Sequence, residues 1–475
     1  MMDGQRSPII FWFRRDLRLA DHPGFHEACH SGRPVLPVFI ADDAVSALGA
    51  APRWRLGRGL EAFAQALEAR GSRLILRRGD AAQVLRTLLR ETGAGAVWWT
   101  RLYDPWAQAR DTAIKSELKQ EGHDARSFDG HLLFEPWTVQ TKSGGYFKVY
   151  SAMWRAVQER EIAASLPEPA HITAPEAWPR SEQLETWTLG AAMNRGAMIV
   201  GAHVSPGEVA ARARLDAFVE TSIDRYKVER DYPAIDATSG MSDYLSLGEI
   251  SPLLLWQAGQ RAKAEHKNGA EHFLKEVAWR EFAYHLMFHA PHMLTENWKE
   301  GWDRFPWRTD PDAPEVLAWK QGRTGIPFVD AAMRELYVTG RMHNRARMIV
   351  ASYLTKHLMT HWKIGMDWFA DTLVDWDPAA NAMGWQWVAG TGPDAAPYFR
   401  VFNPEVQQKK FDPDGAYVAR WLAETQGDPP DIALSYFRAV PRAWGLAPDD
   451  RYPAPVMPLD EGRRRALAAY QLKGV

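Results

Sequence analysis

The sequence predicts two domains of different class, an N-terminal doubly wound parallel sheet and a C-terminal domain that is mostly α-helical. At 475 residues, with 46% hydrophobic residues, the chain is too long for a single core. Its first part alternates short apolar runs with helical periodicity, whereas strand patterns nearly vanish in its second half. We therefore expect an α/β domain over residues 6–134, a connector over 135–206 and a helical domain over 207–475.

The α/β prediction depends on apolar runs that are rich in branched and aromatic residues, as buried strands are. These runs are Ile9–Phe13, Val35–Ala41, Arg73–Arg78 and Ala96–Leu102. Helical periodicity between them covers Leu56–Gly71 and Ala81–Gly93, and both segments end at a glycine suited to the C′ position. No strand is followed by G-x-G-x-x-G, which argues against a conventional dinucleotide site.

Charged residues fill the run Arg14–Pro23, which follows the first strand. The run either lines a ligand crevice at the carboxyl ends of the strands or forms a solvated, salt-bridged loop. In the connector, Pro167, Pro169, Pro175 and Pro179 exclude a long helix and predict a connector that runs over the surface.

Composition narrows the class of protein. The single cysteine, Cys29, excludes internal disulfides and fits a reducing cytoplasm. The N-terminus has neither a signal-peptide core nor a long apolar span, so we expect neither export nor membrane insertion. The net charge of -2 requires any phosphate binding to come from a local basic patch. Half of the 22 tryptophans lie between Trp256 and Trp387, which suggests stacking or electron transfer in addition to core packing.

The stretch Arg341–Trp387 has the most unusual side-chain pattern in the chain. It opens with a predicted helix that carries three arginines and places Asn344, Arg347, Met348 and Ala351 on one face.

A second helix in this stretch is predicted to begin at Pro378 with Asp377 as its N-cap. Asp377, Asn381 and Trp385 then follow at steps of four. One account is a structural ion pair between Arg347 and Asp375 with tryptophans filling the core. The other is a pocket for a large, flat ligand that makes hydrogen bonds.

Several long motifs in order resemble the cryptochrome/photolyase family across nearly the whole chain. They are FWFRRDLRLADHP, the run Tyr226–Pro252, EVAWREF, MHNRARM, WDPAANAMGWQW and AAPYFRVFNP. The resemblance implies an α/β domain that can hold an antenna pigment and a helical domain that binds FAD.

The resemblance also implies the residues of the FAD site. Tyr226 and the segment Thr238–Ser242 (Thr238, Ser239, Gly240, Met241, Ser242) would hold the phosphates and ribose, although an ordinary helix cap is the alternative for that segment. The remaining FAD residues would be Glu276, Arg280, Asn344, Arg347, Asp375, Asp377 and Asn381.

The implied activity is light-driven repair of UV-damaged DNA by electron transfer from reduced FAD, with the lesion flipped out of the duplex. Trp279 and Trp387 would flank the lesion, Met348 would touch it, and Glu276 would bind the thymine carbonyl region. The cations that would contact the DNA backbone are Arg225, Lys227, Arg230, Arg341, Arg345 and Lys409–Lys410, and each of them is individually also explained as solvated surface.

Two positions favour the cyclobutane pyrimidine dimer as substrate. Asn344 and Met348 stand where enzymes for (6-4) photoproducts have histidines. Asn381 stands where photolyases have an asparagine facing flavin N5, while plant cryptochromes usually have aspartate. By the same resemblance Trp385, Trp362 and Trp307 would carry electrons to the oxidised flavin, and Trp376 offers a branch.

Departures from the family pattern make the chain resemble the class III bacterial photolyases, close to plant cryptochromes. Gly240 replaces an arginine, Phe273 a tryptophan and Trp376 a glycine. The Asn–Glu pair that holds a folate antenna in class I is absent from Arg101–Gln108, so a 5,10-methenyltetrahydrofolate would have to stack elsewhere, for example on Trp106. We expect a monomer. The rival functions are a blue-light photoreceptor and a flavoprotein acting in the dark, for which the sequence has no nicotinamide site.

Overall fold

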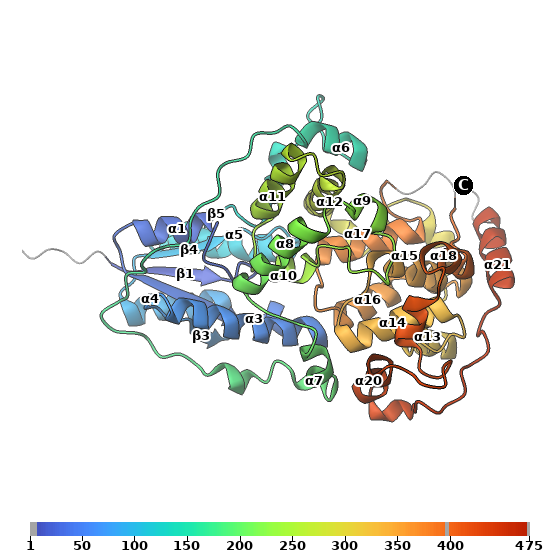
Figure 1. Ribbon diagram of the computed structural model, residues 1–475. Coiled ribbons are helices and arrows are strands. Elements are labelled where there is room, and N and C mark those ends of the chain that lie inside the picture. Colours follow the sequence, from blue (N-terminus) through green and yellow to red (C-terminus); the bar gives the residue numbers. More distant parts are fainter. Residues whose placement is uncertain (1–6, 395–398, 473–475) are drawn as a thin grey trace, which may run out of the picture.

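The computed structural model describes residues 7–394 and 399–472, which form an α/β domain and a helical domain joined by the connector (Figure 1). The α/β domain holds one five-stranded sheet in the order β3-β2-β1-β4-β5. All its strand pairs are parallel, with Ile9 opposite both Val35 and Ala96. The strands are β1 (Ile9–Phe13), β2 (Val35–Ala41), β3 (Ile75–Arg78), β4 (Ala96–Thr100) and β5 (Asp124–Phe128).

Helices cover both faces of this sheet, which is why its central strands are apolar on both sides. The helices are α1 (Pro23–His30), α2 (Asp43–Ser46), α3 (Ala50–Glu68), α4 (Ala81–Thr92) and α5 (Pro105–Gln120). Phe11 and Phe13 of β1 pack with residues of α1 and α3, whereas Ile10 and Trp12 pack with residues of α4 and α5. The predicted fold class is confirmed.

Some predicted boundaries were wrong. The strand predicted over Ala96–Leu102 ends at Thr100, and β5 was missed because its sequence, DARSF, is polar and lies at the sheet edge. Helix α4 does end before Gly93, which has a φ of 64°. Helix α3 instead begins at Ala50 and ends at Glu68, before Gly71.

The charged run Arg14–Pro23 is mostly buried, and Asp21 and Pro23 at its end line a cavity of about 500 Å³. Arg14 donates to both carboxylate oxygens of Asp111 at 3.1 and 3.0 Å, and His22 Nε2 lies 2.9 Å from Asp16 Oδ2. The backbone N–H of Leu17 donates to Leu247 O in the helical domain at 3.1 Å. The run is therefore a buried joint between the two domains, in which ion pairs satisfy the charges.

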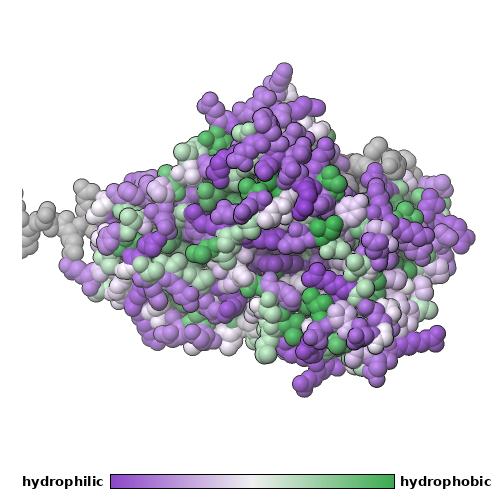
Figure 2. Space-filling view, in the orientation of Figure 1, coloured by the Kyte–Doolittle hydropathy of each residue, from purple (hydrophilic) through white to green (hydrophobic). Residues whose placement is uncertain are grey.

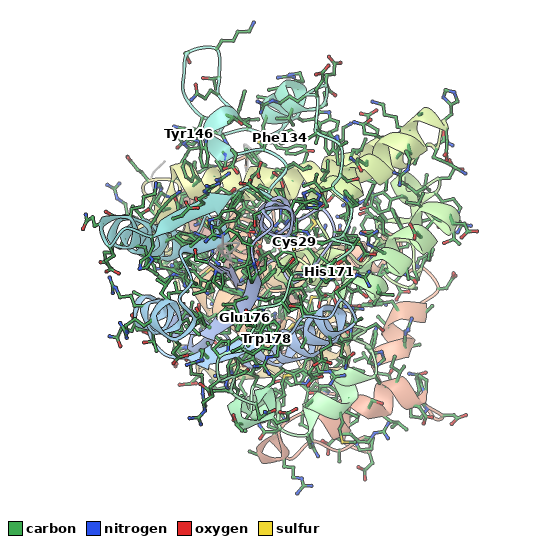
Figure 3. The ribbon with its side chains drawn as sticks, turned by 90° about the vertical axis from the view of Figure 1, so that its left-hand side faces the viewer. Cys29, Phe134, Tyr146, His171, Glu176 and Trp178 are labelled. Carbon is green, nitrogen blue, oxygen red and sulfur yellow. The ribbon has the colours of Figure 1, made fainter. Side chains whose placement is uncertain are left out.

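The middle of the connector is tied to the α/β domain, whereas its two ends pack against the helical domain. It contains α6 (Tyr150–Val157) and α7 (Gly196–Gly201), and between them it passes around the outside of the sheet domain (Figure 1). Its backbone pairs with that domain, from Val35 N–H to Thr173 O and from Glu182 N–H to Leu76 O, both at 2.9 Å. Viewed from the α/β end, His171, Glu176 and Trp178 of the connector lie across this domain (Figure 3).

The helical domain surrounds two apolar cores, one built on α12 and one on α14 and α15. Its helices are α8 (Glu208–Thr221), α9 (Tyr226–Glu229), α10 (Ser242–Leu247), α11 (Pro252–Ala264), α12 (Ala270–His289), α13 (Pro314–Lys320), α14 (Pro327–Thr339), α15 (Asn344–Ser352), α16 (Trp362–Thr372), α17 (Pro378–Ala389), α18 (Pro404–Phe411), α19 (Ala416–Trp421), α20 (Asp431–Ala439) and α21 (Leu459–Leu472). Among the helices in the described residues, none combines the length and apolar character needed to cross a membrane.

The stretch Arg341–Trp387 folds largely as predicted. Helix α15 begins at Asn344, so Arg341 precedes it and the helix carries two of the three expected arginines. Helix α17 begins at Pro378, and Asp377 caps it by accepting from Ala380 N–H at 2.9 Å, which confirms the predicted N-cap.

Candidate functional site

A cavity of about 880 Å³ lies in the helical domain, where α9, α10, α12, α14, α15 and α19 meet the end of the connector. Its walls include most of the residues predicted to bind FAD. These residues are Tyr226, Thr238, Ser239, Gly240, Met241, Ser242, Glu276, Asn344, Arg347 and Asp375. Segments that are far apart in the sequence therefore converge on one concave site.

The wall formed by Thr238–Ser242 is supported from behind by Arg214 of α8. Its Nε donates to Ser239 O at 3.0 Å and its Nη2 donates to Thr238 O at 2.7 Å. Gly240 has a φ of 67°, and a Cβ there would lie 3.2 Å from Arg214 Nε. Helix α10 begins at Ser242 without a side-chain cap hydrogen bond, which weakens the helix-cap interpretation of this segment.

Arg347 and Asp375 form the expected ion pair, and the pair lines the cavity. Arg347 Nη2 donates to Asp375 Oδ2 at 2.7 Å, and its Nε donates to Met342 O at 2.8 Å. Asp375 is 6% exposed, and its Oδ1 has no hydrogen-bond partner among the described residues. A buried acceptor facing a cavity without a donor is costly, so the site fits a ligand that supplies an N–H or O–H group.

Glu276 is held by a cation at the cavity wall. Arg230 Nη1 donates to Glu276 Oε1, and the Arg230 guanidinium lies 5.4 Å from the centre of the Tyr226 ring. Both partners are partly buried, with side-chain exposures of 15% and 33%. The ion pair fixes the orientation of the Glu276 carboxylate.

Three predicted FAD residues, Arg280, Asp377 and Asn381, do not line this cavity. Arg280 donates to His131 O at 3.1 Å and to Glu281, and Asn381 Nδ2 donates to Met366 O at 3.0 Å. Their contacts with FAD stay predictions.

Trp279 is stacked in a manner that the sequence did not indicate. Its ring lies 3.7 Å from that of Tyr150, at an interplanar angle of 7°. Tyr150 begins α6 in the connector, and its hydroxyl donates to Lys275 O at 2.7 Å.

Met348 and Trp387 are half-buried and pack against the core built on α14 and α15. Their contact with a lesion stays a prediction.

The three tryptophans of the predicted electron path run from core to surface. Trp385 is 2% exposed and Trp362 is fully buried, whereas Trp307 is half-buried. His361 lies between the outer two, with its ring 5.4 Å from Trp307 and 5.4 Å from Trp362. Trp385 packs against Phe369 at 5.0 Å.

All four arginines predicted to contact DNA are paired with acids. Arg225 pairs with Glu229, Arg230 with Glu276, Arg341 with Asp243 and Arg345 with Asp231. Arg345 also lies over the Phe411 ring at 4.3 Å. Phosphate contact by these arginines would have to compete with their acidic partners, and it stays a prediction.

Several cavity residues were missed by sequence reasoning. His203 comes from the connector, Glu335 from α14, and Arg420 and Trp421 from the end of α19. Burial raises the pKa of Glu335 to about 7, although Tyr417 donates to its carboxylate. No motif marks these positions, because only the packing of α7 and α19 against α14 brings them to the cavity.

The AAPY portion of the last motif, residues 395–398, lies outside the described residues.

Comparisons with known proteins agree with this geometry. The model for DNA photolyase matches residues 9–171, and the model for the FAD binding domain of DNA photolyase matches residues 273–472. The chain is 45% identical to the deoxyribodipyrimidine photo-lyase of Agrobacterium fabrum, over 99% of this chain and 98% of that protein. It is 34% identical to Cryptochrome-2 of Arabidopsis thaliana, over 96% of this chain and 77% of that protein.

A solved structure of a bacterial class III photolyase from Agrobacterium tumefaciens is similar throughout. Its TM-score is 0.91 at 43% identity, covering 100% of this chain and 99% of that chain. The similarity therefore covers both domains, the one with the parallel sheet and the helical one with the cavity. The chain belongs to the photolyase/cryptochrome family.

Proposed function

We propose that this protein is a deoxyribodipyrimidine photolyase, a light-driven enzyme that uses FAD to split cyclobutane pyrimidine dimers in UV-damaged DNA. The observation that carries the proposal is the 880 Å³ cavity, whose walls bring together the distant residues that the family resemblance assigns to FAD. Full-length similarity to a deoxyribodipyrimidine photo-lyase supports the same activity.

The residues of the cavity suit FAD. Thr238, Ser239 and Ser242 offer hydroxyls for phosphate and ribose, and Arg347 offers a guanidinium. The unpartnered Oδ1 of Asp375 and the buried, unpartnered Nε1 of Trp421 offer an acceptor and a donor to a heteroaromatic ring. FAD, when bound and reduced, supplies the electron that opens the dimer under light.

The chain itself binds and orients the lesion. Trp279, stiffened by its stack on Tyr150, forms a flat wall for the flipped dimer, with Trp387 as the opposite wall. Asn344 and Met348 favour a cyclobutane dimer over a (6-4) product. Glu276, oriented by Arg230, provides hydrogen bonding to the thymine carbonyl region.

Several finer properties belong to the same proposal. The protein acts as a monomer in the cytoplasm, and on the face shown in Figure 2 hydrophobic residues are scattered over a mainly hydrophilic surface. A folate antenna, 5,10-methenyltetrahydrofolate, would stack on Trp106, which is 49% exposed at the start of α5.

The test is to illuminate the reduced holoenzyme with blue light in the presence of DNA carrying a single cyclobutane dimer. We expect restored thymines in the light, none in the dark, and no change in DNA carrying a (6-4) product. Repair of the (6-4) product alone would overturn the substrate assignment.

A blue-light photoreceptor is the second candidate, because the chain is 34% identical to Cryptochrome-2 of Arabidopsis thaliana. That function predicts a light-driven change of the flavin without dimer repair. The same illuminated reaction distinguishes the two, since a receptor would leave the dimer intact.

A further inference from the structure

At Asp377 a side chain of the α/β domain reaches into the helical domain, behind the residues that line the proposed FAD cavity. Arg15, from the loop after β1, donates from Nη2 to Asp377 Oδ2 at 2.8 Å. Its Nε donates to Ser246 O of α10 at 2.8 Å. One side chain from the α/β domain thus joins the end of α10 to the start of α17.

The carboxylate of Asp377 is fully engaged within the protein. Its Oδ1 caps α17 through Ala380 N–H, and its Oδ2 accepts from Arg15 and from the Tyr284 hydroxyl. The residue is 9% exposed and does not line the FAD cavity. Asn381 lies one turn further along the same side of α17.

The surroundings of Asp377 form a buried, mixed-charge cluster. His131 Nε2 lies 3.0 Å from the Tyr284 hydroxyl, and Arg280 contacts His131 and Glu281. The titratable and charged groups that face Asp377 or its partner Arg15 are Arg15, Arg280, Tyr284, His131, Glu281 and Asp104.

We propose that Arg15 is a positioning residue of the flavin site, which holds Asp377 ionised and oriented at the start of α17 and thereby sets the electrostatic environment of the flavin. The proposal rests on the proposed function, because it takes α17 with Asn381 as the helix that faces the flavin. Through Arg15 the α/β domain thus influences flavin chemistry, in addition to any role in holding an antenna pigment.

Asp377 carries its charge in a buried site. Burial alone would raise the pKa of Asp377, but the charges of Arg15 and Arg280 and two hydrogen bonds bring that pKa below its ordinary value. Asp377 therefore keeps its charge throughout the neutral range. Without Arg15, either an under-compensated carboxylate disfavours an added electron nearby, or the carboxylate takes up a proton at accessible pH.

The test is redox titration of the FAD bound to the wild type and to Arg15→Gln, Arg15→Lys and Arg58→Met, across pH 6 to 8. Arg15→Gln keeps a hydrogen-bond donor but removes the charge, whereas Arg15→Lys keeps the charge. Arg58→Met is a matched control, because Arg58 is an exposed arginine on α3 that pairs with Glu61.

We expect Arg15→Gln to shift the midpoint potential of the flavin to a more negative value or to change its dependence on pH. Arg15→Lys should restore most of the wild-type value, and Arg58→Met should equal the wild type.

Equal potentials and equal pH dependence for the glutamine and lysine variants would overturn the proposal, because a merely structural contact does not distinguish them by charge. If Arg15→Gln fails to hold FAD, a lysine variant that retains FAD with the wild-type potential supports the proposal, and loss of FAD in both overturns it. Redox titration requires neither DNA nor repair. Failure of the wild type to repair dimers would therefore overturn the proposed function and leave this measurement valid.

Discussion

Individual side chains set the chemistry proposed for this site, and Asn381 is the residue with the most direct consequence. Its amide Nδ2 donates to Met366 O at 3.0 Å, which orients the amide oxygen away from that carbonyl. The family resemblance implies that Asn381 faces flavin N5, where a neutral amide would permit the anionic reduced ring and a carboxylate would repel it.

Asn381→Asp should therefore shift the resting flavin away from the fully reduced form and make its reduction potential more negative. The measurement is redox titration followed by absorbance, with the wild type as reference. An unchanged potential and an unchanged spectrum after photoreduction would place Asn381 away from the flavin.

A substitution at Arg345 can test whether an arginine that already forms an ion pair within the protein also binds DNA. Its Nη2 lies 2.7 Å from Asp231 Oδ2, and its side chain is 17% exposed. If Arg345 contacts a DNA phosphate, Arg345→Ala should weaken binding to damaged and undamaged DNA alike. The slope of log binding constant against log salt concentration should also fall in magnitude by about one. Binding isotherms at several salt concentrations measure this. No change in the slope would make Arg345 a structural partner of Asp231 and Phe411, and an effect on damaged DNA alone would make it a reader of the lesion.

At the scale of the elements, α16 and α17 carry Trp362 and Trp385, two of the three tryptophans of the proposed electron path. Trp385 of α17 packs against α16 so closely that a Cβ at Gly365 would lie 2.0 Å from its ring. Trp362 opens α16, and its indole N–H donates to Asn297 Oδ1 at 2.8 Å. The packing fits both a relay and an ordinary core, so a substitution must separate the two roles.

Trp385→Phe retains most of the volume while it removes the easily oxidised indole. We expect slow or absent photoreduction of the oxidised flavin, with near-normal dimer repair after chemical reduction. Flash photolysis and a repair assay measure the two effects. Normal photoreduction contradicts the relay, and lost repair after chemical reduction makes Trp385 structural or a lesion contact. Truncation to alanine is less informative, because the cavity alone would cost about 3–5 kcal/mol.

At the scale of the whole molecule, buried ion pairs join the two domains. Arg55 of α3 and Glu249, which follows α10, are both fully buried, and Arg55 Nη1 donates to Glu249 Oε1 at 2.9 Å. Glu249 Oε1 also accepts from Gly207 N–H, where the connector enters α8. The pair thus links the α/β domain, the connector and the helical domain.

Arg55→Met should destabilise the protein by about 3–5 kcal/mol, because it leaves the Glu249 charge buried without its partner. Arg55→Met combined with Glu249→Met should be less destabilising than the single change. Denaturant unfolding of both variants measures this, with Arg58→Met as the exposed control. If the double variant is the less stable of the two, Glu249 stabilises the fold through other contacts, such as the one with Gly207 N–H, and its unpaired charge is not the cause of the loss.

Sequence patterns were enough to predict the fold class and the start of α17, and local causes suffice for these two features. The family resemblance added ten of the residues that line the cavity, which also has walls that no motif marks. Continuous apolar runs specify buried parallel strands, and Asp377 followed by Pro378 specifies the start of α17 whatever surrounds it. Which side chains meet is set by tertiary packing, because Arg15 and Asp377, or Tyr150 and Trp279, are adjacent only after the domains and connector pack. Such long-range pairs leave no periodicity in the chain. For that reason the sequence could not show that most of Arg14–Pro23 forms a buried joint between the domains while Asp21 and Pro23 line a cavity.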